Sequence, residues 1–328
     1  MRGWLIPLLI VAVAVLFAAS LAVGPAGIGF GAGLRALVMD TGTPATLVMR
    51  EIRLPRAILG MLIGAGLGLA GAAMQGLIRN PLAEPGMIGV SGAAALGAVL
   101  AIHTGAAAAF ALALPFAALA GAALAVLLIL TLAGPRGGTL TLILAGVAIS
   151  ALTGAATSLV LNLSPNPYAA AEIVFWMMGS LADRSMTHVW LAAPFILAGG
   201  AVLLVCGRGL DALTLGEDAA ATMGVSVTRL RLAVVLGTAA AVGAATAVAG
   251  AVGFVGLVVP HLLRRAVGGS PSRLLSASAL GGAVMVLAAD VATRVLAPDR
   301  DLKLGVLTAL VGAPFFLHLI RRLGREAE

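Results

Sequence analysis

The residues with the clearest capacity for chemistry are arginines beside an apolar stretch. Arg50, Arg53 and Arg56 are spaced three apart, so on a helix they share one face. Guanidinium groups in this arrangement can anchor a membrane helix among lipid headgroups. They can also bind the carboxylates of an acidic external partner. The sequence leaves both interpretations open.

A second charged pair lies within an apolar stretch. Asp290 and Arg294 are four residues apart, the spacing of a helical ion pair. Charges inside membrane spans are costly and often mark function. The spacing predicts a local pair that orients Arg294. A proton relay, typical of secondary transporters, would require a second intramembrane acid facing Asp290, and we identify none.

Other side chains in or near the apolar stretches could line a translocation pathway. The candidates are Gln75, Asn80, Trp176, Met177, Met178 and His261. Core packing is an alternative for each of them. For His261, a packing hydrogen bond is favoured over ligation of haem iron. The chain has no Cys/His cluster with metal-ligand spacing, so we expect no resident metal or other cofactor.

One polar segment, at about 209–228, separates two apolar stretches. Its composition predicts two short helices hinged at Gly216, because an alanine-rich run follows that glycine. Acids in the first turn favour the second helix, and Gly224 is placed to end it. A small helix with a flat alanine face suits a groove on another protein, although a solvated loop is the alternative. The docking residues would be Leu215, Gly216, Glu217, Asp218, Ala219, Ala220 and Gly224.

Composition determines the fold class. Hydrophobic residues make up 61% of 328 and charged residues 10%, with a mean hydropathy of +1.12. Soluble domains carry about 25% charged residues. We therefore predict an all-α polytopic membrane protein with a single transmembrane domain at 1–328. The net charge of +7 is assigned to loop arginines that set topology, and not to binding of nucleic acid.

Hydropathy predicts ten membrane spans. The first apolar run, Trp4 to Val23, is longer than the core of a signal peptide and is interpreted as a retained helix. More of the 20 Lys and Arg residues fall on the side of the N-terminus, which predicts that both termini are cytoplasmic. The spans are 4–24, 56–78, 88–103, 108–132, 139–162, 187–206, 229–250, 254–266, 274–296 and 303–322.

Glycines in the second span leave one helix face bare. Gly60, Gly64 and Gly68 recur every four residues and would let another helix approach closely, which is one reason to expect a homodimer. An ATP site is not expected. A phosphate-binding loop ends in Lys-Ser or Lys-Thr, whereas the single lysine, Lys303, is followed by Leu304. Energy from ATP would have to come from another chain.

Motifs along most of the chain resemble those of one family, the permease subunits of type II ATP-binding-cassette (ABC) importers for ferric siderophores, haem and cobalamin. The matching segments are Arg53–Arg56, Ala73–Gln75, Asn80–Gly86, Gly89–Ser91, Phe175–Ser180, Leu215–Glu217, Gly224–Val225, Gly253–His261, Leu287–Asp290 and Gly305–Pro314. The resemblance implies ten helices per subunit, with helices two to five and seven to ten related as an inverted repeat. It implies a dimer that lines one pathway.

The resemblance also implies partners and roles. It places the dimer in the bacterial inner membrane with two ATPase subunits and a periplasmic substrate-binding protein. Arg53, Arg56 and Arg294 would pair with glutamates of the binding protein, and 211–225 would enter the ATPase. One motif departs from the family, because Asp301–Lys303 replaces the usual Glu-Leu-Pro before the last helix.

The expected function is therefore that of a permease subunit importing an iron complex, either a ferric siderophore or haem. A cobalamin permease is the alternative, because these permeases share the motifs. A proton-coupled secondary transporter is a more remote alternative. It would be expected to carry paired acids or His–acid relays near the midplane.

Overall fold

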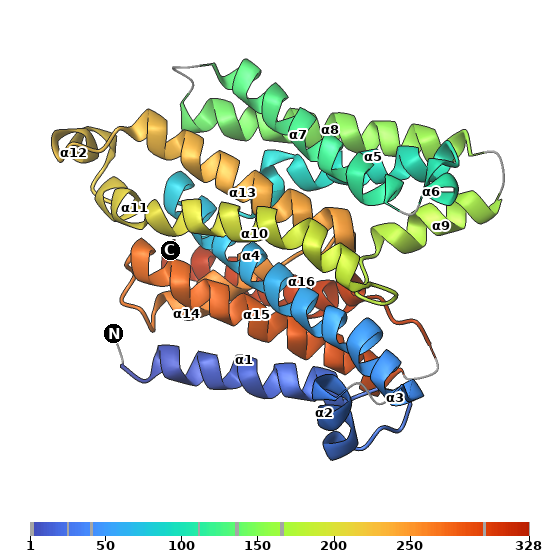
Figure 1. Ribbon diagram of the computed structural model, residues 1–328. Helices are drawn as coiled ribbons and strands as arrows, with labels where there is room; N and C mark the ends of the chain where they lie inside the picture. Colours follow the sequence, from blue (N-terminus) through green and yellow to red (C-terminus); the bar gives the residue numbers. More distant parts are fainter. Residues whose placement is uncertain are drawn as a thin grey trace.

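The computed structural model describes residues 3–24, 26–39, 42–110, 112–134, 138–164, 167–297 and 300–327. Most of the long helices run roughly along one direction in a single bundle (Figure 1). Within these described ranges, seven helices are long and apolar enough to span a membrane, and three shorter apolar helices complete the ten predicted spans. The seven are α1 (Leu5–Ala22), α4 (Leu54–Ile78), α7 (Ala113–Ala133), α8 (Thr139–Asn162), α10 (Met186–Val205), α13 (Val227–Ala249) and α15 (Pro271–Leu296). The three are α5 (Val90–His103), α14 (Val255–Arg264) and α16 (Leu304–Ala327).

Short elements gather at the two ends of the bundle. One end carries α2 (Phe30–Val38), α3 (Pro44–Leu47), the π-helical turn η1 (Val48–Arg53), α6 (Ala106–Ala109) and the start of α9 (Pro167–Met177). The opposite end carries α11 (Gly207–Leu213), α12 (Glu217–Thr222) and both chain termini (Figure 1). We call these the outer end and the inner end. The remaining short helix, η2 (Pro85–Ile88), precedes α5.

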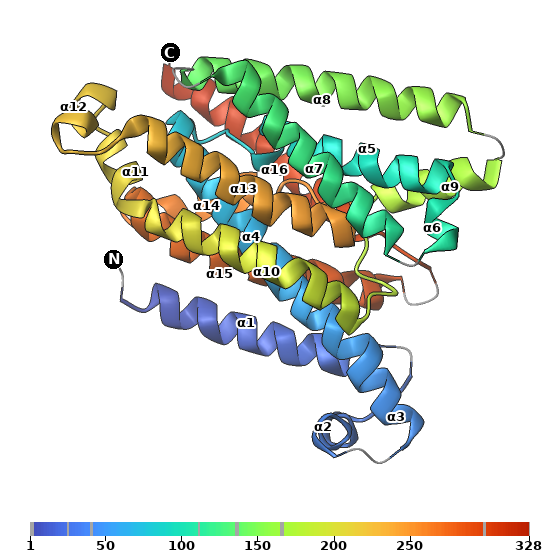
Figure 2. The ribbon, with the colours of Figure 1, turned by 45° about the horizontal axis from the view of Figure 1, so that its top comes forward.

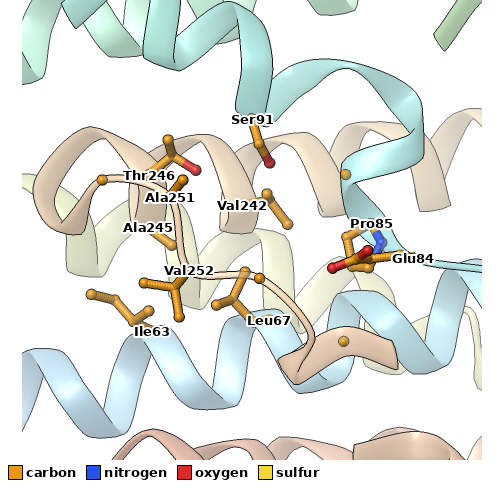
Figure 3. Close-up of a pocket in the computed structure, with 14 residues that line it drawn as sticks. Ile63, Leu67, Glu84, Pro85, Ser91, Val242, Ala245, Thr246, Ala251 and Val252 are labelled. Atoms are coloured by element: carbon orange, nitrogen blue, oxygen red, sulfur yellow. The ribbon is translucent and has the colours of Figure 1, made fainter. Parts of the chain in front are cut away.

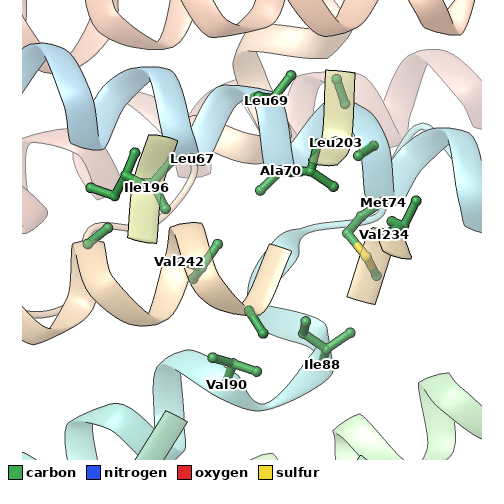
Figure 4. Packing of buried hydrophobic residues seen from close by; sticks show 14 of the residues in the cluster. Leu67, Leu69, Ala70, Met74, Ile88, Val90, Ile196, Leu203, Val234 and Val242 are labelled. Atoms are coloured by element: carbon green, nitrogen blue, oxygen red, sulfur yellow. The ribbon is translucent and has the colours of Figure 1, made fainter. Parts of the chain in front are cut away.

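Two central helices are covered by the others. In α4 and α13 most of the span is buried inside the chain, whereas in α1, α7, α8 and α10 fewer than a third of the residues are buried. Figures 1 and 2 place α1 and α8 at opposite edges of the bundle. Leu67 and Met74 of α4 lie close to Val234 and Val242 of α13 in the core (Figure 4). The outer helices thus present apolar side chains to lipid and the central helices pack against protein.

The glycine face of α4 packs directly on α15. A Cβ atom added at Gly68 would lie 2.1 Å from the Ser278 carbonyl oxygen, and one at Gly64 would lie 2.3 Å from that of Gly282. Only bare backbone fits at this separation. The close approach of a helix is as predicted, but the inference of a homodimer from this face is wrong. The face is occupied within the chain.

The order of helices repeats with opposite direction. A long helix, a short helix and two further spans occur as α4, α5, α7 and α8, and again as α13, α14, α15 and α16. In Figure 1, α4 begins at the outer end and α13 begins at the inner end. In both halves non-helical backbone precedes the short helix, at 79–84 and at 250–254. This arrangement is the inverted repeat that the resemblance implied.

Candidate functional site

Two arginines share one buried carboxylate at the outer end. Asp290 is 1% exposed and accepts hydrogen bonds from Arg56 Nε at 2.8 Å and from Arg294 Nη2 at 2.7 Å. The predicted pairing of Asp290 with Arg294 is confirmed. Arg56 was not predicted as a partner, because 234 residues separate it from Asp290 and no local pattern links them.

Arginines at this end also cap α1. The last carbonyl groups of a helix have no partner within it, and the helix dipole favours cations there. Arg294 Nη1 and Arg53 Nη1 donate to these carbonyls over distances of 2.7–3.0 Å. The acceptors are the oxygens of Ser20, Leu21, Ala22 and Val23. We call Arg53, Arg56, Asp290 and Arg294 the arginine network.

An open depression of about 320 Å³ lies beside the arginine network. Its charged lining consists of Arg56, Arg294, Arg300 and Asp301, so cations outnumber acids. Arg56 and Arg294 therefore border a surface that an acidic partner could reach. Arg53 is buried and does not line the depression, and its bonds to the carbonyls of Leu21 and Ala22 place it in the support of α1.

The unusual lysine before the last helix is held by its neighbours. Lys303 Nζ forms a salt bridge with Asp301 and lies 5.6 Å from the centre of the Phe175 ring. This cation–π contact joins the start of α16 to α9. The sequence that replaces the family's Glu-Leu-Pro thus keeps a defined contact at the outer end.

The two short helices predicted at the inner end are present. Gly216, at φ +108°, separates α11 from α12, as expected of a glycine hinge. Gly224, at φ +84°, lies just beyond α12. Leu215 and Met223 are 68% and 62% exposed on either side of α12. Helix α12, which these exposed side chains flank, protrudes from the inner end of the bundle (Figure 1).

The orientation of α12 corrects one predicted docking residue. Ala220 is fully buried, and its carbonyl accepts the N–H of Val225 at 3.0 Å, so it faces the chain and not a partner. Ala219 is half-buried, whereas Asp218 is exposed. Glu217 forms a salt bridge of 3.2 Å with Arg231 on α13. We call Leu215–Gly224 the coupling surface. Ala220 is not among its side chains that a partner can contact.

One acid of the inner end was missed. Asp211 Oδ1, on α11, accepts the N–H of Ser272 at 2.9 Å and the hydroxyl of Ser270 at 3.2 Å, at the start of α15. The sequence carried a partial signal, because Ser270 followed by Pro271 is typical of a helix start. Nothing in the sequence indicated that the cap would come from another helix.

Gln75 holds two helices together inside the chain. Its Nε2 atom donates to the carbonyls of Gly256 and Leu257, at 3.3 and 3.4 Å, and its Oε1 atom accepts from Arg264 Nη2 at 2.6 Å. The side chain is buried. The structure therefore supports the packing alternative for Gln75 and corrects its assignment to an open pathway.

The other predicted pathway residues lie on different elements of the chain. Asn80 is exposed at the inner end of α4, where its Oδ1 atom accepts the N–H of Leu82 at 2.9 Å. Trp176 and Met177 are half-buried and Met178 is exposed, at or just beyond the end of α9. His261 meets Phe315 edge-on, with ring centres 5.7 Å apart. Their place in a pathway between two copies stays a prediction.

A small, partly open pocket lies between the two halves of the repeat. It measures about 140 Å³, and its polar side chains are Glu84, Ser91 and Thr246 (Figure 3). Glu84 Oε1 accepts the N–H of Phe254 at 3.0 Å, which joins the non-helical segment before α5 to the one before α14. No cluster of three or more His, Cys, Asp or Glu is present among the described residues.

A helical bundle with an inverted repeat, interrupted short helices and a helix pair protruding from one end defines a membrane transport protein of the permease class. The chain belongs to the FecCD transport family, whose sequence profile matches residues 10–322. This membership agrees with the motif resemblance, which extends from Arg53 to Pro314.

Relatives of known name include three permease proteins. The cobalamin import system permease protein BtuC of Halobacterium salinarum is 40% identical over 285 residues, which cover 86% of this chain and 76% of that protein. The hemin transport system permease protein HmuU of Yersinia pestis is 36% identical and covers 98% of each chain. The Fe(3+) dicitrate permease protein FecD of Escherichia coli is 36% identical, covering 88% and 90%.

A solved structure shares the fold over nearly the whole length. It is an inward-facing conformation of a metal-chelate type ABC transporter. The two chains superpose with a TM-score of 0.85 at 31% sequence identity. The alignment covers 97% of this chain and 98% of the other.

Proposed function

We propose that this chain is the permease subunit of an ABC importer and that two copies work with two separate ATPase subunits. The coupling surface is the observation that carries this proposal. Leu215 and Met223 are exposed beyond the end of the bundle, where water would surround them unless another protein covers them. An ATPase groove is the occupant that family membership favours.

We assign the outer end to a periplasmic substrate-binding protein. The depression lined by Arg56, Arg294 and Arg300 carries excess positive charge and suits acidic side chains. Transport would then run from the outer end to the inner end. This orientation makes both termini cytoplasmic, since they lie at the end that carries α12 (Figure 1). The membrane would be the bacterial inner membrane.

The proposed cargo is an iron complex, either haem or a ferric siderophore. Relatives named for hemin and for Fe(3+) dicitrate support it. Cobalamin is the second candidate, supported by the 40% identity to the named cobalamin permease protein. Each is a bulky chelate, which suits a wide pathway that binds weakly, because tight binding would hinder release.

The test is uptake into proteoliposomes that contain the permease, its ATPase and its binding protein. We expect accumulation of haem or a ferric siderophore that requires ATP inside. Accumulation of cobalamin alone would select the second cargo. Uptake driven by a pH gradient without ATP would contradict the proposal and support a proton-coupled transporter.

A further inference from the structure

The first turn of α15 is capped by a residue of a different helix. The N-cap residue of α15 is Ser270, and its side chain makes no capping hydrogen bond. Asp211 of α11 supplies the acceptor, with 2.9 Å between its Oδ1 atom and the backbone nitrogen of Ser272. A carboxylate there satisfies an otherwise unpaired N–H and interacts favourably with the helix dipole. The cap therefore links α11 to α15.

Apolar contacts hold α11 in the same position. A Cβ atom added at Gly207 would lie 3.1 Å from Ser272 Cβ and 3.4 Å from Leu275 Cδ1, so the two backbones are close. Leu210 and Leu213 of α11 are buried in the core. The polar cap and this packing together fix the helix that precedes the coupling surface.

Helix α15 connects this cap to the outer end. It runs without interruption for 26 residues, about 39 Å at 1.5 Å per residue. Its single proline, Pro271, is in the first turn, where proline does not bend a helix. Near its other end, Asp290 and Arg294 belong to the arginine network.

The other helices that adjoin the coupling surface or α11 lack either a member of the arginine network or a hydrogen-bonded cap from α11. Helices α10 and α13 adjoin it along the chain, but neither carries a member of the arginine network. Helix α4 carries Arg56, and its inner end meets α11 through apolar contact, with Gly76 beside Leu210. Apolar contact has no directional bond to prevent sliding. Only α15, among these helices, is held at one end by an ion pair and at the other by a cap from α11.

We propose that Asp211 is a positioning residue that ties α11 to α15, so that docking at the outer depression moves the coupling surface through α15. The inference rests on the proposed function, because it names the path between its two partner surfaces. Asp211 lies outside the coupling surface, which begins at Leu215, and does not line the depression. It acts by making α15, α11 and the coupling surface move together.

The test measures ATP hydrolysis in proteoliposomes with and without cargo-loaded binding protein. We expect Asp211→Ala to lower the stimulation ratio about fivefold, the size of change that loss of one helix cap produces. ATPase copurification and binding-protein affinity should be unchanged. Asp211→Asn should keep most of the stimulation, because asparagine caps a helix about as well as aspartate.

A second variant separates linkage from local stability. Asp211→Ala combined with Ser270→Asp gives α15 a cap of its own without the bond to α11. We expect it to restore thermal stability while stimulation stays low. Full stimulation in this double variant, or in Asp211→Ala alone, would overturn the inference.

A matched cap elsewhere serves as the control. Ser185→Ala removes the hydroxyl that lies 3.2 Å from His188 Nδ1 at the outer start of α10, and we expect normal stimulation. Equal loss in this variant would mean that any missing cap impairs coupling, which contradicts a specific role for Asp211. If wild-type protein binds no ATPase or shows no stimulation, the proposed function itself fails, and that outcome is distinct from failure of the Asp211 inference.

Discussion

The two ends of the molecule offer different kinds of surface to a partner. At the outer end, Arg56 and Arg294 are already bound to Asp290, and Arg294 also caps α1. At the inner end, Leu215 and Met223 are exposed. An external protein must therefore compete with contacts inside the permease, whereas an internal protein gains by covering apolar side chains.

This difference indicates different energetics for the two partners. Charges at the edge of an interface mainly raise the association rate, and salt screens the attraction between them. Buried apolar side chains mainly lower the dissociation rate, since they add contact in the bound state. We therefore expect a transient, salt-sensitive partner at the outer end and a stable partner at the inner end.

The largest effect is predicted for a substitution that disrupts the packing of α4 on α15, the two helices that join the outer end to the inner end. Gly68→Leu would force a side chain into the Ser278 carbonyl, which lies 2.1 Å from the position of a Cβ atom. We expect no folded permease and the loss of both partners, measured by size-exclusion chromatography in detergent. Gly31→Leu is the control, because a Cβ atom there has no neighbour within 4 Å. Normal yield of Gly68→Leu would contradict the rigid pairing of α4 and α15.

Removing the buried acid should have the next largest effect. Asp290→Ala leaves two guanidinium groups without their shared carboxylate, and breaking a buried pair in this way costs about 3–5 kcal/mol. Thermal unfolding in detergent measures the loss. Asp301→Ala breaks the more exposed pair with Lys303 and should cost about 0–1 kcal/mol. Equal stability of the two variants would show that the arginine network does not support the outer end.

Charge at the coupling surface should release the inner partner selectively. Leu215→Asp with Met223→Asp should reduce ATPase copurification more than tenfold, because burial of one such side chain is worth about 1.5–3 kcal/mol. Leu34→Asp with Val38→Asp, on exposed residues of α2 at the outer end, is the matched control. Loss of the ATPase in the control as well would indicate general damage.

The smallest predicted effect concerns the rim of the depression. Arg300 is exposed and lines it, so Arg300→Glu should slow docking of the binding protein a few-fold at low salt. The difference should vanish near 1 M salt, where charges are screened beyond about 3 Å. Stopped-flow mixing measures the rate. Arg273→Glu at the inner end should leave it unchanged, and equal slowing there would indicate a nonspecific charge effect.

The sequence predicts what depends on composition and local spacing. Runs of apolar residues locate the ten spans within a few residues, because hydrocarbon thickness determines helix length. Gly216 marks the hinge before α12, because glycine readily adopts a positive φ. The pair of Asp290 with Arg294 follows from a spacing of four on one helix.

Contacts between distant segments could not be predicted in the same way. The cap from Asp211 and the bond between Arg56 and Asp290 each join residues far apart in the chain. The sequence also could not show the direction in which a small side chain faces. Alanine is compatible with a buried or an exposed position, so composition alone did not show that Ala220 packs inward.

Native mass spectrometry of the intact complex tests the contrast between the two ends most directly. Wild-type permease should appear as two copies with two ATPase subunits and a bound binding protein. The Leu215→Asp and Met223→Asp permease should lose the ATPase while still binding the binding protein in low salt. A variant complex that retains both ATPase subunits would contradict the account, because the coupling surface would then not be where the ATPase binds.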